Sequence, residues 1–120
     1  SNNLNYNDAI YDYGNLIYMS PEQKESGICD FKSDIFSLGL IYVEMFLDIK
    51  TEMEKIEIFQ KLNNIIDIDE IEQIKEFDKN YNIYSGFSKK LLYKMCAKDP
   101  DSRITANELN RIFSNKFQDI

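Results

Sequence analysis

The stretch FKSDIFSLGLIYVEMFL, residues 31–47, decides the fold of this 120-residue chain. Its apolar residues follow one another so closely that on a helix they surround almost the whole cylinder. A helix that is apolar all round is either buried in a protein core or inserted in a membrane. The run is too short to cross a bilayer and it contains Glu44. The sequence therefore predicts a central core helix that is buried on all sides.

Further helices are predicted on both sides of this stretch by their capping residues. A Ser or Thr followed three residues later by Glu or Gln is typical of the first turn of a helix. The pattern occurs at Ser20 and Gln23, at Thr51 and Glu54, and at Thr105 and Glu108. Pro21 suits the first position of its helix, and Gly27 suits the end. Ser88 is expected to cap one more helix, which reaches Cys96.

Two amphipathic segments complete the predicted secondary structure. In the helix that begins at Thr51, the core face is expected to hold Met53, Ile56, Phe59 and Leu62, and the solvent face Glu54, Lys55, Glu57 and Lys61. Residues 67–77 are predicted to form one helix, with an apolar face made by Ile68, Ile71, Ile74 and Phe77. Residues 1–15 and 80–86 are predicted to be irregular. No strand pattern competes convincingly, and the length suits one domain, so the sequence predicts a single all-α domain.

The composition argues against several classes of function. The net charge is −7, and an acidic surface repels nucleic-acid backbones and anionic membranes. The chain contains no histidine and only two cysteines, Cys29 and Cys96, which do not form a CxxC pair. A zinc site and catalysis by a Ser–His or Cys–His pair are therefore not expected. Both thiols are expected to be buried and reduced.

Three segments resemble, in order, the signature of a eukaryotic protein kinase. GNLIYMSPE, residues 14–22, resembles the end of the activation segment. SDIFSLG, residues 33–39, resembles the start of the long central helix in the C-terminal lobe, the C-lobe. Residues 91–106, which open with LL and close with DPDSRITA, resemble the signature near the end of the domain. Each segment alone is common, but the three in this order are specific. They disfavour the alternative of an unrelated helical binding domain.

A narrower resemblance points to the kinases of the alpha subunit of translation initiation factor 2. Three segments look like that family: YMSPEQ at residues 18–23, DIFSLGL at residues 34–40, and TEMEK at residues 51–55. Phe36 stands where most kinases have Trp, and Phe is also the residue found in that family. The alternative is a different serine/threonine kinase.

The kinase resemblance implies how the chain is divided and what its parent protein does. Residues 1–19 are expected to form the end of the activation segment and the P+1 loop, which supports the substrate residue after the phosphoacceptor. Residues 20–120 are expected to form the helical C-lobe. The parent is expected to be a cytoplasmic kinase that transfers the γ-phosphoryl of ATP, with Mg²⁺, to a Ser or Thr of initiation factor 2 alpha.

The motifs that bind ATP in kinases are absent from this sequence. Without histidine there is no H-R-D motif, and neither D-F-G nor G-x-G-x-x-G occurs. The chain is therefore expected to contain no catalytic residue and to bind no cofactor or metal by itself. Its expected partners are the protein substrate and the N-lobe and catalytic loop of its own parent.

The resemblance also implies a set of substrate-binding residues. They are Gly14, Asn15, Tyr18, Glu54 and Lys55. Asn15 departs from the family pattern, in which a Thr bonds the catalytic aspartate and frames the substrate hydroxyl. Asn keeps a hydrogen-bond donor and an acceptor. It either takes the same role or indicates a pseudokinase, an interaction module without phosphoryl transfer.

Three further residues are implied to be structural. Glu22 and Arg103 match a buried ion pair of the family, in which the planar guanidinium grips the carboxylate with two hydrogen bonds. The alternative is that each pairs with another group at the surface. Asp34 is implied to accept backbone N–H bonds from the catalytic loop of the parent. Without that loop, a carboxylate in the first turn of a helix would stabilise it by about 0.3–1 kcal/mol.

Overall fold

The computed structural model describes residues 16–78 and 83–118, and of residues 116–118 only the backbone. In these ranges the regular structure is helical, and the only extended pairing is an isolated antiparallel bridge between Leu47 and Ile83. The elements are α2 (Pro21–Ser26), α3 (Phe31–Phe46), α4 (Glu52–Leu62), α5 (Ile68–Glu72), the 3₁₀ helix η1 (Lys75–Phe77), α6 (Lys89–Cys96), the 3₁₀ helix η2 (Pro100–Ser102) and α7 (Ala106–Gln118). The predicted all-α class is confirmed. Residues 1–15, predicted to be irregular, lie outside the described residues.

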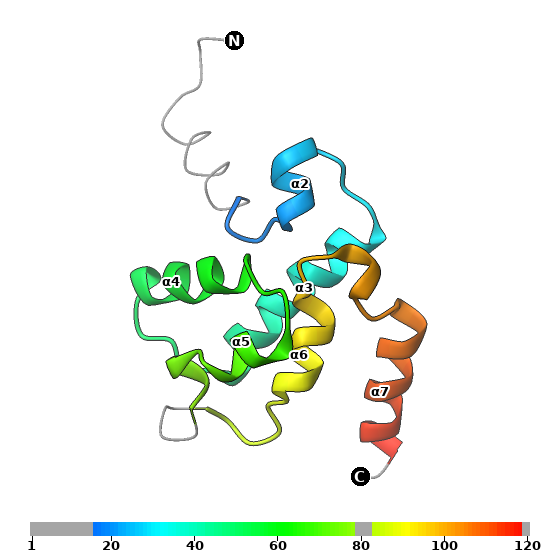
Figure 1. Ribbon diagram of the computed structural model, residues 1–120. Coiled ribbons are helices and arrows are strands. Elements are labelled where there is room, and N and C mark those ends of the chain that lie inside the picture. Colours follow the sequence, from blue (N-terminus) through cyan, green and yellow to red (C-terminus); the bar gives the residue numbers. More distant parts are fainter. Residues whose placement is uncertain (1–15, 79–82, 119–120) are drawn as a thin grey trace, which may run out of the picture.

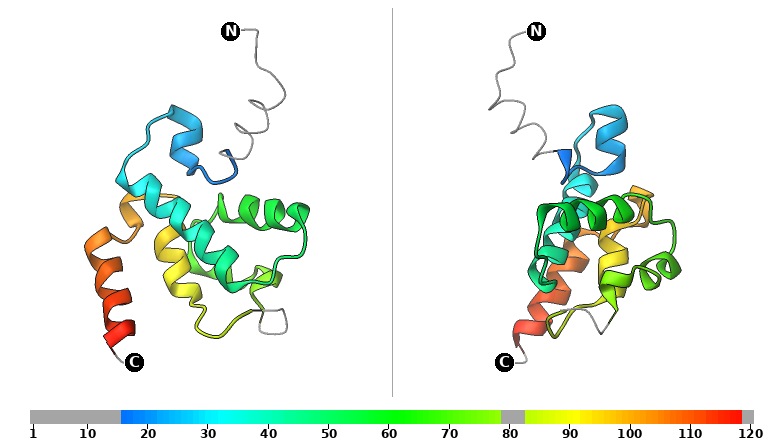
Figure 2. Two further views of the ribbon diagram at one scale, coloured as in Figure 1. Left: turned by 180° about the vertical axis from the view of Figure 1, so that it is seen from behind. Right: turned by 90° about the vertical axis from the view of Figure 1, so that its left-hand side faces the viewer.

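Helices α3 and α6 pack against each other at the centre of the molecule (Figure 1). Helices α4 and α7 lie on opposite sides of this pair, as the view from behind in Figure 2 also shows. Fully buried side chains fill the contact between α3 and α6: Phe36, Leu40, Leu92 and Met95. None of the helices in the described ranges is both long and apolar enough to cross a membrane.

The predicted caps are present at the helix starts. The side chains of four capping residues accept hydrogen bonds from backbone N–H groups three residues later: Ser20, Thr51, Ser88 and Thr105. Gly27 ends α2 in the left-handed conformation, with φ of 74°, which costs glycine little because it has no Cβ. These bonds satisfy backbone donors that no helix can pair internally, so they locate the starts of the helices.

The central helix is not buried on all sides, so that part of the prediction was wrong. Ile35, Phe36 and Val43 are buried, but Leu38, Ile41 and Met45 are exposed, and Met45 retains 67% of its accessible surface. The spacing of three and four residues puts these three side chains in one stripe along α3. Apolar residues on all sides make burial of the whole helix favourable. Whether each side is buried depends on which neighbouring elements lie against it.

Residues 67–77 form two short helices instead of one. Ile74 has extended backbone angles, φ −72° and ψ 114°, and separates α5 from η1. Ile71, Ile74 and Phe77 are buried as predicted, whereas Ile68 is exposed. Glu76, in the 3₁₀ helix that follows Ile74, is also buried. Periodicity stops predicting which side chains share a face where the helix is interrupted.

The two cysteines differ, and only one of them is buried as predicted. Both are free thiols, but Cys29 is exposed and Cys96 is fully buried beside α3. Burial raises the pKa of the Cys96 thiol to about 12, although the nearby Arg103 acts to lower it. Cys96 is therefore protonated at neutral pH and behaves as a small apolar core residue.

Candidate functional site

Glu22 and Arg103 form the predicted ion pair with two hydrogen bonds. Arg103 Nη1 donates to Glu22 Oε2 at 2.6 Å, and Nη2 donates to Oε1 at 2.8 Å. The Arg103 side chain is completely buried, and the Glu22 side chain is 24% exposed. The pair joins the first turn of α2 to the segment between η2 and α7, which are about 80 residues apart in the sequence. It therefore fixes α2 to the helical core.

The remaining donors of Arg103 bind backbone carbonyls of two other segments, α3 and the residues that follow α6. Nε donates to the Ala97 carbonyl at 2.7 Å, and Nη1 also donates to the Lys32 carbonyl at 2.9 Å. The guanidinium carbon lies 5.0 Å from the centre of the Phe36 ring, which is within the range of a cation–π contact. Among the described residues, no buried side-chain nitrogen or oxygen lacks a hydrogen-bond partner. The buried charge of Arg103 is thus compensated by the Glu22 carboxylate and by hydrogen-bond acceptors of the backbone.

The pKa of Glu22 reflects these contacts. Partial burial acts to raise it, but the hydrogen bonds from Arg103, from the Glu22 backbone and from the Ser33 hydroxyl lower it to about 2. Ser33 Oγ donates to Glu22 Oε2 at 3.0 Å. The carboxylate is therefore ionised throughout the neutral and mildly acidic range.

Acid is expected to weaken the fold through Glu22. Its folded-state pKa lies below the ordinary value of 4.5, so its stabilisation is complete above that value and is lost as the pH falls towards 2. Urea unfolding between about pH 6 and pH 2.5 measures the loss. Glu22→Gln should lower stability at pH 6 but reduce the further loss on acidification. As a control, replacing the exposed Glu25 of the same helix by Gln should lower stability at pH 6 by less than Glu22→Gln does. Equal acid sensitivity in Glu22→Gln and the unaltered chain would contradict the assignment.

Tyr18, in the loop before α2, is held by side chains of α3 and α4. Its hydroxyl donates to the Glu44 carboxylate, and its backbone carbonyl accepts from Ser37 Oγ at 2.6 Å. Its ring meets that of Phe59 edge to face, with 5.5 Å between the centroids. The sequence analysis assigned none of these three partners, Glu44, Ser37 and Phe59, to the site. Glu44 had one recognisable signal, because it is a lone carboxylate within the apolar run of α3.

Lys55 lies against Tyr18 instead of facing solvent, contrary to the prediction. Its ammonium is 5.8 Å from the centre of the Tyr18 ring and 3.3 Å from Glu52 Oε1, and its side chain is only 15% exposed. Burial acts to lower the pKa of Lys55, but Glu52, Tyr18 and Glu44 raise it above its usual value. Burial and the Glu44 carboxylate raise the pKa of Tyr18. At neutral pH the site therefore contains a charged Lys55 and a neutral Tyr18.

The core face of α4 was assigned correctly only in part, since Ile56 is half-buried and Met53 does not belong to it. Met53 is 68% exposed, and Ile58 is fully buried together with Phe59 and Leu62. Residues 53, 56, 59 and 62 are three apart, and at 100° per residue the first and last lie about 180° apart on a helix. Met53 and Leu62 therefore cannot share one face, and this could have been read from the sequence.

Two other charged residues of the predicted solvent face of α4 have partners in the structure. Glu54 is half-buried, and its Oε2 accepts from the Lys50 backbone N–H at 3.3 Å. Lys61 Nζ binds both carboxylate oxygens of the buried Glu76, at 3.0 and 3.1 Å. Glu57 is exposed as predicted. The outward stripe of α4 consists of Met53, Glu57 and Gln60, spaced by four and three residues.

Asp34 lies in the first turn of α3, exposed, beside a hollow of about 270 Å³. The Cys29 thiol is 3.8 Å from Asp34 Oδ1. Tyr18 and Ser37 line the same hollow, so the structure brings Asp34 close to the loop that contains Tyr18. Gly14 and Asn15 lie outside the described residues. Within those residues, no group of three or more acidic, cysteine or histidine side chains is arranged to hold a metal ion.

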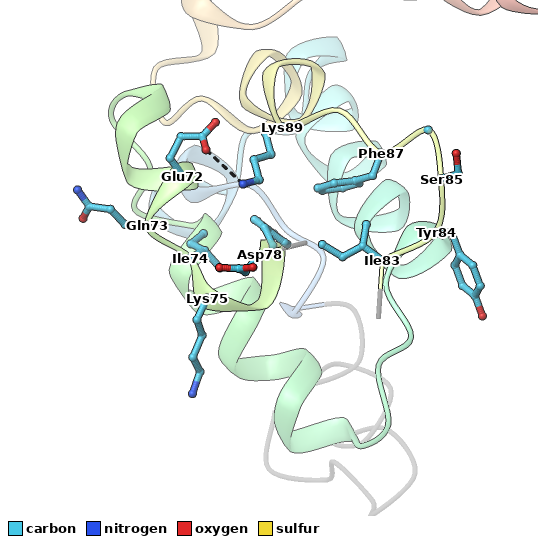
Figure 3. Close-up of a pocket in the computed structure, with 12 residues that line it drawn as sticks. Glu72, Gln73, Ile74, Lys75, Asp78, Ile83, Tyr84, Ser85, Phe87 and Lys89 are labelled. Atoms are coloured by element: carbon cyan, nitrogen blue, oxygen red, sulfur yellow. Dashed lines mark hydrogen bonds and ion pairs between the residues drawn. The ribbon is translucent and has the colours of Figure 1, made fainter. Parts of the chain in front are cut away.

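Another hollow, of about 940 Å³, lies between α5 and the segment that leads into α6 (Figure 3). Its rim carries the ion pair between Lys89 Nζ and Glu72 Oε2, 3.2 Å apart. None of the residues assigned to the site from the sequence lines it. Asp78 and Ile83 in its wall adjoin residues 79–82, outside the described ranges, and we assign it no ligand.

The comparisons with known proteins define the class. The model of the protein kinase domain family matches residues 3–113, and the chain belongs to this family. The described part is a helical C-lobe of that fold. No solved structure matches the chain.

The similar relatives are kinases by name, and some of them are named as kinases of translation initiation factor 2 alpha. The interferon-induced, double-stranded RNA-activated protein kinase of Rattus norvegicus is 42% identical over 93 residues, 77% of this chain and 16% of that protein. Eukaryotic translation initiation factor 2-alpha kinase 1 of Mus musculus is 50% identical over 42 residues, 35% of this chain and 7% of that protein. Eukaryotic translation initiation factor 2-alpha kinase 2 of Plasmodium berghei is 34% identical over 102 residues, which are 84% of this chain and 3% of that protein. The chain thus spans at most 16% of the length of these three relatives.

Proposed function

We propose that this chain forms the substrate floor of a serine/threonine protein kinase. In this proposal residues 1–19 are the end of the activation segment and the P+1 loop, and residues 20–120 are the helical C-lobe. The observation that carries it is the fixation of the Tyr18 loop between α3 and α4, close to Asp34. A loop held on both sides provides a rigid surface on which a peptide segment can be positioned for transfer.

The proposed substrate is the alpha subunit of translation initiation factor 2. The motifs in residues 18–23, 34–40 and 51–55 support it, as do the names of the similar relatives. ATP and Mg²⁺ are proposed to bind parts of the parent protein that this chain does not contain, since it has no phosphate- or magnesium-binding motif. The kinase domain is proposed to face the cytosol.

Two features of α3 support contact with other parts of the parent kinase. The exposed stripe of Leu38, Ile41 and Met45 is apolar, and covering it would remove that surface from water. The exposed carboxylate of Asp34 can accept backbone N–H bonds, which is the role proposed for it towards the catalytic loop. Asp34 lines the same hollow as Tyr18, so the catalytic loop of the parent would complete the active site there.

The test is phosphoryl transfer by the full-length protein. Purified parent, Mg²⁺ and γ-labelled ATP are incubated with intact initiation factor 2 alpha, and the acceptor is mapped by mass spectrometry. Labelling of one Ser or Thr, lost when that residue is changed to Ala, is the expected outcome. If the parent labels no protein, whether or not it binds ATP, the result would favour the pseudokinase alternative that Asn15 suggests. Labelling of other proteins but not of this factor would refute the substrate assignment.

We further expect α4 to dock the intact substrate through its outward stripe. Met53→Ala combined with Glu57→Ala removes an exposed apolar group and an exposed charge without touching the core. Loss of such contacts should raise KM for the intact factor about tenfold, since residues central to an interface contribute more than about 1 kcal/mol each. A short peptide around the acceptor does not reach α4, so its KM should not change. Steady-state kinetics with both substrates measures the difference.

The control for docking is a pair of substitutions on another helix. Asn107 and Asn110 are exposed on α7, on the other side of the α3–α6 pair from α4. Changing both to Ala should leave KM for the intact factor and for the peptide unaltered. Unchanged KM for the intact factor in the α4 variant would exclude docking by this stripe, while leaving phosphoryl transfer itself in place.

A further inference from the structure

Tyr18 is the point at which α3, α4 and the loop before α2 meet. From α3, Glu44 binds its hydroxyl and Ser37 binds its backbone carbonyl. From α4, Phe59 packs against its ring, and Lys55 places its ammonium near it. The contacts with α3 fix the loop, so the contacts with α4 decide where that helix lies relative to the loop.

Lys55 is suited to this connection by charge and by confinement. An ammonium is attracted to an aromatic ring, and more strongly where water is excluded. The Lys55 side chain is 15% exposed, and the pair with Glu52 on the same helix holds its ammonium in place. A side chain covered in this way has little surface left for a docked protein. Outside α4 its ammonium lies near the Tyr18 ring, and it is also attracted to the Glu44 carboxylate that binds the Tyr18 hydroxyl.

We infer that Lys55 is a positioning residue: through the ring of Tyr18 it holds α4 and the P+1 loop in one rigid frame. A substrate docked on the outward stripe of α4 then presents its acceptor at a defined place above the loop. This inference rests on the proposed function. It replaces the direct substrate contact that the sequence suggested for Lys55.

The test compares two substitutions of Lys55 in the full-length protein. Lys55→Met removes the charge but keeps an unbranched chain over the ring, and Lys55→Arg keeps the charge. If Lys55 positions the loop, Lys55→Met should lower kcat for the short peptide about 3- to 10-fold, because small displacements of an acceptor slow transfer strongly. KM for the intact factor should change less than about twofold, since the docking stripe is intact. Lys55→Arg should restore kcat.

Two controls tie the effect to Tyr18. Lys90 is an exposed lysine of α6, and Lys90→Met should alter neither kcat nor KM. In a Tyr18→Leu background, Lys55→Met should lower kcat no further, because the ring through which it acts is gone. Hydrogen exchange supplies a readout that needs no activity: the amides of residues 17–19 should exchange several-fold faster in Lys55→Met than in the unaltered protein.

The outcomes separate this inference from the proposed function. Lower peptide kcat together with faster exchange at residues 17–19, both restored by Lys55→Arg, would support it. Unchanged hydrogen exchange at residues 17–19 would overturn the inference. A raised KM for the intact factor with unchanged peptide kcat would also overturn it, and would indicate that Lys55 contacts the substrate directly. If the unaltered protein transfers phosphoryl to no protein, the proposed function fails first, and the positioning role fails with it.

Discussion

Arg103→Ala is expected to lower the free energy of unfolding by about 3–5 kcal/mol, as found when one partner of a buried ion pair is removed. The Arg103 side chain is fully buried, and it binds Glu22 and three backbone carbonyls. Its removal takes a donor from each of these acceptors, leaves the Glu22 carboxylate without its cationic partner, and leaves a cavity beside Phe36. Urea unfolding followed by circular dichroism at neutral pH measures the change.

The chain offers a matched control for this substitution. Arg111 is its only other arginine and is exposed on α7, so Arg111→Ala should change stability by less than about 0.5 kcal/mol. Arg103→Lys should fall between the two, because it keeps the charge but loses the planar fork that binds both carboxylate oxygens. A loss below about 1 kcal/mol for Arg103→Ala would mean that the pair is not buried in solution as it is in the structure.

Gly39→Ala is expected to destabilise the chain by about 1–3 kcal/mol, the usual cost of overpacking a core. In an exposed helix the same change would stabilise by about 0.5–1 kcal/mol. Here α3 and α6 approach so closely that a Cβ at position 39 would lie 2.4 Å from Cys96 Sγ and 3.0 Å from Met95 Cβ. The Met95 atom is attached directly to the backbone, so α6 itself must shift.

A second substitution tests whether this contact is the cause. Cys96→Ala removes the nearest atom, so Gly39→Ala should cost less in that background than in the unaltered chain. A double-mutant cycle on unfolding free energies gives the coupling, for which adjacent residues usually show about 0.5–3 kcal/mol. Rescue should be partial, because Met95 Cβ remains. Additive effects would show that Gly39 and Cys96 do not touch in solution.

The helix starts, which depend on neighbours in sequence, were predicted correctly. Ser20, Thr51, Ser88 and Thr105 cap the helices expected of them, because each cap needs only a backbone N–H three residues away. The pair of Glu22 and Arg103 was anticipated from the kinase resemblance. Nothing local to either residue shows a partner about 80 positions away.

The site was predicted less completely, because its contacts come from separate segments. Tyr18 and Lys55 were each assigned separately as substrate-binding residues, with no contact expected between them. The structure places the Lys55 ammonium near the Tyr18 ring and adds Glu44, Ser37 and Phe59 as partners. An ammonium on a helix is read as solvated unless the element that covers it is known.

The capped helix starts, the all-α class and the family motifs could thus be read from residue order, since hydrogen bonds within a turn and side-chain spacing act over a few residues. Packing alone decided that Leu38, Ile41 and Met45 form an exposed stripe. It also decided that Glu76 is buried and paired with Lys61, and that Lys55 lies against Tyr18. Burial depends on which distant segments cover a side chain. The free energy that places those segments belongs to the whole core and not to any one stretch of the chain.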